Sequence, residues 1–391
     1  MNKSFLVIII IGVLLFTIIP VSAQEITLKA VDPSPYYDSK PCTNGDYIVW
    51  RRAINQNDNE YIELREPSWI MVYNMRSGES WNITEKNKLM GNPNIYYHAE
   101  SPEIHGNKII YERQRSPNSY DTGLFMYNIS SNETWEVPLR STSHAHGHHH
   151  LIEGDWIAYT HKESNKRQAY LLNYEDGNYR TIIGKNEGYS VFGMVMWGNS
   201  VVITALNNSG GFEILTYNIN STVRSNIEIG GNYSKAIATT IYENQVGICI
   251  KEGSDNQTQW NAYIYNMDTG VLGVFKDNVY GLLIDESRII YQVGDEIHIA
   301  EAGKETVIIR SIGRQYMGDV CDNAVVWMDN SNAEGDYGDA RDDFDVFFRK
   351  EISQREVARQ FISKNVIVIA IIIAVVFIGI LSRRDGKEGM I

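Results

Sequence analysis

The chain has 391 residues, of which 43% are hydrophobic, enough apolar side chain for one large all-β domain. Its formal net charge of −13 argues against a nucleic-acid partner, because no basic face is available to neutralise phosphates. Solubility in water and binding of cations are the two roles that an acidic surface favours.

The first segment, residues 1–23, is predicted to be a secretory signal peptide. Lys3 gives a charged start, Phe5–Ile19 is apolar, and Val21–Ala23 fits the small-residue rule for cleavage. An uncleaved anchor is the alternative. After this segment, Glu25–Ala30 alternates in polarity before the first repeat begins, so it is available as an extra β-strand.

A short phrase returns seven times, about every forty residues, and a strand-forming repeat of that period is typical of a β-propeller. Each phrase begins with a turn residue and continues with β-branched or aromatic residues, as in GDWIAY at Gly154–Tyr159. The seven phrases start at Gly45, Gly106, Gly154, Gly198, Glu243, Glu286 and Asp322.

A second phrase, containing Tyr-Asn in most repeats, follows each first one, as at Met71–Met75, and leads into a turn and a short outer strand. With the stretch before each phrase as the innermost strand, every repeat makes a four-stranded blade. Residues 24–350 are therefore predicted to form an all-β, seven-bladed β-propeller. We expect the orphan strand Glu25–Ala30 to complete blade seven, because closing the ring removes two exposed sheet edges.

Five of the nine histidines lie in His144–His150, just before the third repeat. Counted back from the repeat glycines, His146 and His148 occupy the same offsets as His98 and Glu100 one repeat earlier. Equal offsets lie side by side in adjacent blades, so these four residues are predicted to form a zinc or copper site near one mouth of the channel. The alternative is a polar tract that binds metal only adventitiously.

The segment Asp329–Asp345 is acidic and connects the two central strands of blade seven. Its carboxylates Asp329, Asp336 and Asp339 could supply calcium ligands, although the spacing does not match an EF-hand. A solvated acidic loop is the favoured interpretation. Together with the connection Arg51–Ser68 of blade one, this segment could frame a binding surface.

Three cysteines are present. Cys42 and Cys321 both precede a repeat phrase, on the innermost strands of blades one and seven, so a disulfide between them is a candidate lock for the ring. Three small buried apolar residues are the alternative. Seven sequons predict glycosylation at Asn82, Asn128, Asn132, Asn207, Asn220, Asn232 and Asn256.

After the repeats, residues 351–364 are predicted to be a juxtamembrane linker. Residues 365–382 contain the apolar run Val366–Leu381 and are predicted to be a single transmembrane helix. Residues 383–391 begin with two arginines, so the positive-inside rule predicts a cytoplasmic tail and an extracellular propeller.

The phrases GDYIVW at Gly45–Trp50 and VVWMDN at Val325–Asn330 resemble the TolB-like and YVTN-type propellers of archaeal cell-surface proteins, particularly those of methanogens. The resemblance covers roughly residues 25–350. It implies the propeller fold and a cell-surface location, and it carries over no catalytic residue.

These features predict a membrane-anchored cell-surface propeller that acts as a binding or envelope protein, in adhesion or as a scaffold. Its partners are expected to be the membrane, through the C-terminal helix, and an envelope protein or glycan. The alternative is a metal-dependent hydrolase or lyase acting on surface polysaccharide, with the histidine-rich metal site as its Lewis acid.

Overall fold

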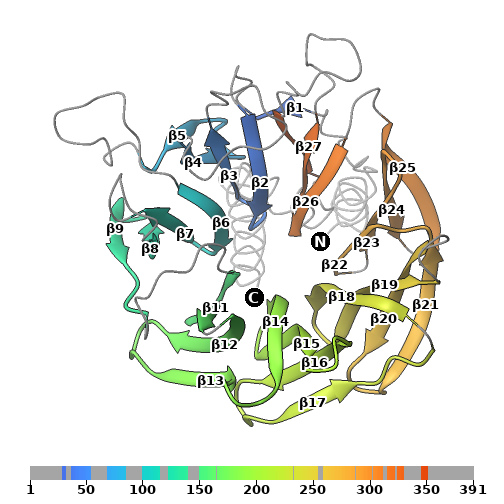
Figure 1. Ribbon diagram of the computed structural model, residues 1–391. Helices are drawn as coiled ribbons and strands as arrows, with labels where there is room; N and C mark the ends of the chain where they lie inside the picture. The colour runs from blue at the N-terminus through green and yellow to red at the C-terminus, as the bar shows by residue number, and fades with distance from the viewer. Residues whose placement is uncertain are drawn as a thin grey trace, which may run out of the picture. The chain divides into compact units, whose positions relative to one another are not determined.

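The computed structural model describes residues 29–31, 37–53, 68–84, 99–114, 122–139, 149–163, 165–231, 233–253, 259–286, 288–301, 303–310, 315–321, 324–329 and 345–350. These residues form seven antiparallel sheets of four strands each. The sheets follow one another around a ring (Figure 1), and each innermost strand contacts the innermost strands of both neighbouring blades. The predicted seven-bladed β-propeller is confirmed.

The blades share one strand order, from the channel outward. The innermost strands are β2 (Tyr37–Thr43), β6 (Ala99–His105), β10 (His150–Glu153), β14 (Tyr189–Trp197), β18 (Tyr233–Tyr242), β22 (Gly281–Asp285) and β26 (Gln315–Cys321). The second strands are β3 (Tyr47–Ala53), β7 (Lys108–Gln114), β11 (Trp156–Glu163), β15 (Ser200–Asn207), β19 (Gln245–Glu252), β23 (Arg288–Val293) and β27 (Ala324–Asp329).

The third strands are β4 (Ser68–Asn74), β8 (Thr122–Asn128), β12 (Lys166–Asn173), β16 (Phe212–Asn218), β20 (Gln259–Asn266), β24 (Glu296–Glu301) and β28 (Asp345–Lys350). The outer strands are β5 (Ser80–Asn82), β9 (Glu133–Glu136), β13 (Tyr179–Ile183), β17 (Arg224–Ile227), β21 (Val271–Asp277), β25 (Lys304–Arg310) and, for blade seven, β1 (Lys29–Ala30).

The two repeated phrases mark the two kinds of hairpin. The first residue of the first phrase lies in the turn between innermost and second strands, with φ of +56° at Gly106 and Gly154. Glycine adopts this left-handed conformation without steric cost, which explains its recurrence there. The Asn of the second phrase starts the next hairpin: Asn74 Oδ1, for example, accepts hydrogen bonds from the backbone N–H groups of Arg76 and Ser77.

The N-terminal strand closes the ring as predicted. Lys29 pairs with Phe348 and Ala30 with Phe347, and Val31 N–H donates to the Val346 carbonyl at 2.7 Å. Val31 is completely buried in a cluster that includes Trp50 of blade one. The closing segment therefore completes the sheet of blade seven and also packs against blade one.

The hydrophobic core lies between adjacent blades rather than at one centre. The last residue of the repeat phrase is buried in all seven blades. It is isoleucine in two blades, Ile203 and Ile248, and aromatic in the other five: Trp50, Tyr111, Tyr159, Tyr291 and Trp327. Because each inter-blade layer is filled by its own cluster, the ring can vary along its innermost strands without losing its core.

The predicted signal peptide, juxtamembrane linker, transmembrane helix and cytoplasmic tail lie outside the described residues. Within the described ranges, no helix is long and apolar enough to cross a membrane. The compact unit that contains the propeller is Leu28–Arg349.

Candidate functional site

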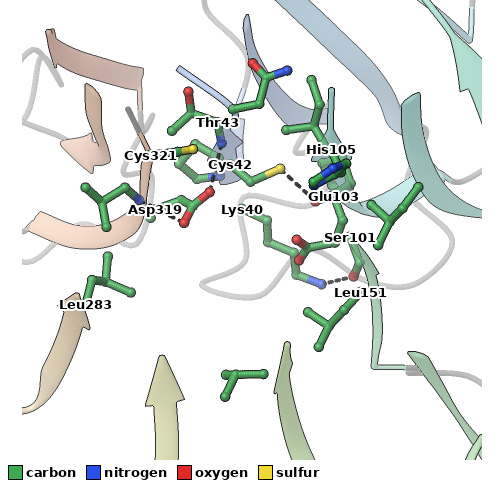
Figure 2. A pocket seen from close by; sticks show the side chains of 18 of the residues that line it. Lys40, Cys42, Thr43, Ser101, Glu103, His105, Leu151, Leu283, Asp319 and Cys321 are labelled. Atoms are coloured by element: carbon green, nitrogen blue, oxygen red, sulfur yellow. Dashed lines mark hydrogen bonds between the residues drawn. The ribbon is translucent and has the colours of Figure 1, made fainter. Parts of the chain in front are cut away.

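A cavity of about 1620 Å³ runs along the innermost strands of the propeller, and its lining divides into two halves. Blades 1, 2, 3 and 7 contribute nearly all of its ionisable groups: Lys40, Glu100, Glu103, His105, His149, His150, Glu153, Arg167 and Asp319. Figure 2 shows four of them around the cavity, Lys40, Glu103, His105 and Asp319. Blades 4, 5 and 6 contribute a mostly apolar wall: Val195, Met196, Trp197, Ile241, Leu283 and Ile284. The cavity is therefore amphipathic.

Two equivalent bulges shape the polar half. In β2 and β6 the register shifts at Ser39–Cys42 and at Glu100–Glu103, because Pro41 and Pro102 have no N–H to donate to the ladder. The residues before these prolines, Lys40 and Ser101, both have a φ of +51°. A non-glycine residue rarely adopts that conformation, and such local strain is characteristic of functional positions.

The two bulges are in direct contact. Lys40 Nζ donates a hydrogen bond to Ser101 Oγ at 2.7 Å and lies 3.6 Å from the Glu100 carboxylate. About half of the Lys40 side chain remains exposed (51%), so its ammonium group is accessible from the cavity. The strained backbone thus turns a cation and a hydroxyl from neighbouring blades toward the same space.

Two carboxyl groups of the cavity, Glu103 of blade 2 and Asp319 of blade 7, have raised pKa values. Burial raises the pKa of Glu103 to about 8, and the charge of Asp319 adds to that effect while Lys40 opposes it. Burial also raises the pKa of Asp319 to about 6, against two backbone N–H donors, Thr43 at 2.9 Å and Val320 at 2.8 Å. Both side chains keep some contact with cavity solvent, but the surrounding strands desolvate them. At neutral pH Glu103 is mainly protonated and Asp319 mainly charged.

The predicted disulfide between Cys42 and Cys321 is not formed. Cys42 is a buried thiol whose Sγ donates to the Pro102 carbonyl at 3.1 Å, and Figure 2 shows it directed toward blade 2. Cys42 packs in the cluster between blades 1 and 2, so its side chain faces away from blade 7. Burial, and then the charges of Glu103 and Asp319, raise the pKa of this thiol, which makes it a poor nucleophile.

The seam between blades 1 and 7 is made by backbone contact instead. A Cβ at Gly318 would lie 2.6 Å from Pro41 Cγ and 2.8 Å from the Pro41 carbonyl oxygen, so only glycine allows β26 to approach β2 this closely. This approach positions Asp319 for its hydrogen bond from Thr43 N–H.

Cationic groups gather at one corner, where blades 1, 2 and 3 meet. The pKa of His149 is lowered by partial burial first and then by the electrostatic effects of Arg167, His150 and Lys40, which Glu112 opposes. His150 is buried, with Nε2 2.5 Å from the Ser101 carbonyl oxygen and Nδ1 3.6 Å from Glu112 Oε1. We refer to Lys40, Ser101, His149 and Arg167 as the cationic corner.

Of the predicted metal ligands, only Glu100 lies within the described residues, and its carboxylate is engaged by Lys40. His98, His146 and His148 lie outside them, so the zinc or copper site stays a prediction. The described part of the chain contains no group of three or more His, Cys, Asp or Glu arranged to hold a metal. For the predicted calcium loop, Asp329 is a buried residue at the end of β27, and Asp336 and Asp339 lie outside the described residues.

The predicted glycosylation acceptors differ in accessibility. Asn132 and Asn220 are exposed in turns, whereas Asn82, Asn128 and Asn207 are half-buried. Asn207 Nδ2 donates to Glu213 at 2.7 Å, so a glycan on that nitrogen would disturb an existing bond. Asn232 and Asn256 lie outside the described residues. Glycosylation at all seven positions stays a prediction.

The sequence did not predict five residues that line the cavity: Lys40, Ser101, Glu103, Arg167 and Asp319. A signal for the first two was present: Lys-Pro and Ser-Pro fall inside predicted innermost strands, where proline requires a bulge. No comparable local signal marks Arg167 or Asp319, which come from other blades.

Comparisons with known proteins show the fold. The β-propeller domain of the Trilobed protease from Pyrococcus furiosus superposes with a TM-score of 0.54 at 14% identity, covering 85% of this chain and 97% of that domain. An acylaminoacyl peptidase from Pyrococcus horikoshii (TM-score 0.53, 12% identity) and a prolyl endopeptidase (TM-score 0.55, 8% identity) each match 75% of this chain.

The chain spans only 49% and 46% of those two peptidases, so the likeness concerns a propeller unit and not a whole enzyme. The Trilobed protease domain is described as having an open velcro topology, whereas β1 closes the ring here. No protein-family model and no curated protein matches the sequence. The comparisons thus show the β-propeller fold, and none supports the assignment to archaeal cell-surface proteins.

Proposed function

We propose that this protein is a cell-surface binding propeller that holds its ligand in the central cavity, on the polar half formed by blades 1, 2, 3 and 7. The observation that carries the proposal is the amphipathic lining: ionisable side chains converge on one side of a cavity whose other side is apolar. Ligand sites combine an apolar surface with a few convergent polar groups in this way.

The size of the cavity agrees with this role. Its volume of about 1620 Å³ exceeds the roughly 300–1,000 Å³ typical of small-molecule pockets, so it has room for an oligomeric or extended ligand. The strained bulges at Lys40 and Ser101 support the same conclusion, because a strained backbone that turns polar groups into a cavity is easier to explain by binding than by stability.

The cell-surface location is supported by the sequence alone. Residues 1–23 have the features of a secretory signal, and 365–382 those of a membrane helix followed by arginines. The anchored propeller would act in adhesion or as an envelope scaffold, with a glycan or an envelope protein as its partner.

Protease treatment of intact cells tests the location. We expect digestion to remove the propeller and leave the membrane fragment, while a cytoplasmic marker stays intact. Protection of the propeller on intact cells, with digestion after lysis, would contradict the proposal.

Saccharide-array binding with two tryptophan variants of the full-length protein tests the place of the ligand. Met196→Trp adds bulk to the cavity wall, whereas Val274→Trp adds it on the outer strand of blade 5, where the side chain is exposed. We expect Met196→Trp to lose the saccharides that wild type binds and Val274→Trp to keep them. Equal retention by both variants would exclude the cavity as the site.

A further inference from the structure

We infer that the cationic corner is a receptor for an oxyanion, so that the ligand of the cavity carries a carboxylate, sulfate or phosphate group bound by Lys40, Ser101 and Arg167. This inference rests on the proposed function and specifies the chemistry of the ligand. An anion-binding site is unexpected in a chain with a formal net charge of −13.

The acidic groups of the cavity already have partners. Glu153 lies 3.1 Å from His105, Asp46 lies 3.4 Å from Arg76, and Asp285 is paired with Arg288 in a buried contact. Glu100 is paired with Lys40, and Asp319 accepts two backbone N–H groups. Of the acidic groups near the cationic corner, Glu112 lies 3.6 Å from His150 Nδ1, and the others have the partners just named.

Arg167 lines the same cavity from the start of β12. Its backbone N–H donates to Ser190 Oγ at 3.2 Å, but within the described part of the chain its guanidinium group has neither a hydrogen bond nor an ion pair. A half-buried guanidinium without a carboxylate is unusual in an acidic protein. Its planar array of donors suits bidentate binding of an oxyanion.

Lys40 of blade 1, Ser101 of blade 2 and Arg167 of blade 3 line one cavity. Lys40 Nζ donates to Ser101 Oγ at 2.7 Å, and about half of the Lys40 side chain is exposed. A bound oxyanion in this part of the cavity therefore has two cationic groups and a hydroxyl in the same lining.

Neutral donors complete the receptor. Ser101 Oγ accepts a hydrogen bond from Lys40, which leaves its own O–H to donate. The protonated Glu103 carboxyl is a further donor in the same cavity. Ser39 Oγ also lines it, is buried, and has no hydrogen-bond partner in the described ranges. These groups are donors, and a ligand oxyanion would supply the acceptors.

The test uses the full-length protein in nonionic detergent and three probes that share one sugar ring: glucose, glucuronate and glucose 6-sulfate, with inorganic phosphate as a fourth. Isothermal titration gives the affinities. We expect at least one anionic probe to bind at least about tenfold more tightly than glucose, as one charge-assisted contact provides. The preferred probe identifies the oxyanion.

The decisive variants are neighbours in sequence. Arg167→Gln should lower the affinity for the anionic probe by roughly 10- to 100-fold, the effect of losing one charged hydrogen-bonding partner. Lys166→Gln removes the same charge, but its ammonium bonds Asn208 at 2.7 Å, away from the cavity lining, so affinity should not change. Arg167→Lys should restore part of the affinity. The melting temperatures of all variants establish that they are folded.

Two results would overturn the receptor: no anionic probe binding more tightly than glucose, or equal losses of affinity in Arg167→Gln and Lys166→Gln. The proposed function can survive such a result. If array saccharides still bind, are lost in Met196→Trp and are unaffected by Arg167→Gln, the cavity is the ligand site but not an oxyanion receptor.

Discussion

Blades 1 and 2 and blades 4 and 5 share the same strand order, yet their innermost strands differ in chemistry. In β2 and β6, proline-induced bulges turn Lys40 and Ser101 toward the channel. In β14 and β18, strands of 9 and 10 residues have bulges without proline and line the channel with apolar residues such as Val195 and Ile241. The difference indicates that the second and third strands stabilise each blade, so the sequence of the innermost strand can differ from blade to blade.

The seams between blades show the same contrast. Between blades 4 and 5, Ala238 N–H donates to the hydroxyl of Thr204 at 3.0 Å, and between blades 5 and 6, Ile284 N–H donates to Thr240 at 3.4 Å. At the seam of blades 7 and 1, a carboxylate of perturbed pKa replaces the hydroxyl, since Thr43 N–H donates to Asp319. At the seam of blades 7 and 1 an ionisable carboxyl group therefore accepts the bond that a neutral hydroxyl accepts at the other two seams.

The largest effect is expected from breaking the buried ion pair of blade 1. Asp38 is completely buried, and its Oδ1 lies 2.7 Å from Arg52 Nε. Asp38→Asn should lower the free energy of unfolding by about 3–5 kcal/mol, because it leaves a buried guanidinium without its counter-charge. Urea denaturation measures the loss. Thr204→Val, at the neutral seam, should lose only about 1–2 kcal/mol. Similar losses for the two variants would refute the contrast between the halves.

A second prediction concerns the histidines near blades 2 and 3. If His98, His146 and His148 form a metal site with Glu100, replacing the three histidines by alanine should reduce zinc or copper affinity by at least about 100-fold, since loss of even outer-shell partners costs 10- to 100-fold. Competition with a chromogenic chelator measures the affinity, and His144→Ala is the control. Equal affinity of wild type and triple variant would show only an adventitious histidine tract.

A third, smaller effect is a pH dependence of stability located in the polar half. The pKa of Glu103 is raised to about 8 in the folded protein, so the folded state binds its proton more tightly than the unfolded state. The stabilising contribution of that proton is complete below about pH 4.5 and is lost as the pH rises toward 8. Asp319 has the same sign, with a loss between about pH 4 and 6.

Glu103→Gln should flatten this dependence, so that the variant gains about 1–2 kcal/mol over wild type between pH 5 and 8, after allowance for solvent contact in the cavity. Melting temperatures across that pH range measure the effect. Thr240→Val, in the apolar half, should change the melting temperature by the same amount at every pH. A Glu103→Gln profile parallel to wild type would contradict the raised pKa.

The smallest effect is expected from relieving the backbone strain at Lys40, in the bulge of β2. Lys40 has a φ of +51°, where a Cβ is unfavourable. Lys40→Gly and Lys40→Ala both remove the ion pair with Glu100, but only glycine relieves the strain, so the glycine variant should be more stable by about 1 kcal/mol. Denaturant unfolding of the pair measures the difference. Equal stability, or a more stable alanine variant, would mean that the bulge is not strained.

The repeat phrases predicted most of the fold because their information is local. A turn residue followed by β-branched and aromatic residues determines a hairpin wherever it stands, and seven hairpins at a regular period can bury their faces only against each other. The closing strand was predictable for a similar reason: an alternating segment was left over, and a sheet edge needed a partner.

The site was predicted only in outline. Equal offsets in adjacent blades correctly place Glu100 near the channel, but offset alone does not specify that Lys40 of the neighbouring blade engages it. The Cys42–Cys321 pairing was wrong for the same reason, since adjacent positions in the ring do not determine which way a side chain points.

By itself the sequence determined the all-β class, the seven blades, the closure by the N-terminal strand and the turn residues, all of which depend on neighbours in the chain. Only the tertiary structure decided which side chains meet in the cavity. Lys40, Arg167 and Asp319 come from blades 1, 3 and 7, and they line one cavity only after the ring has closed. Burial and mutual charge, which exist only in the folded ring, then raise the pKa values of Glu103 and Asp319 and lower that of His149.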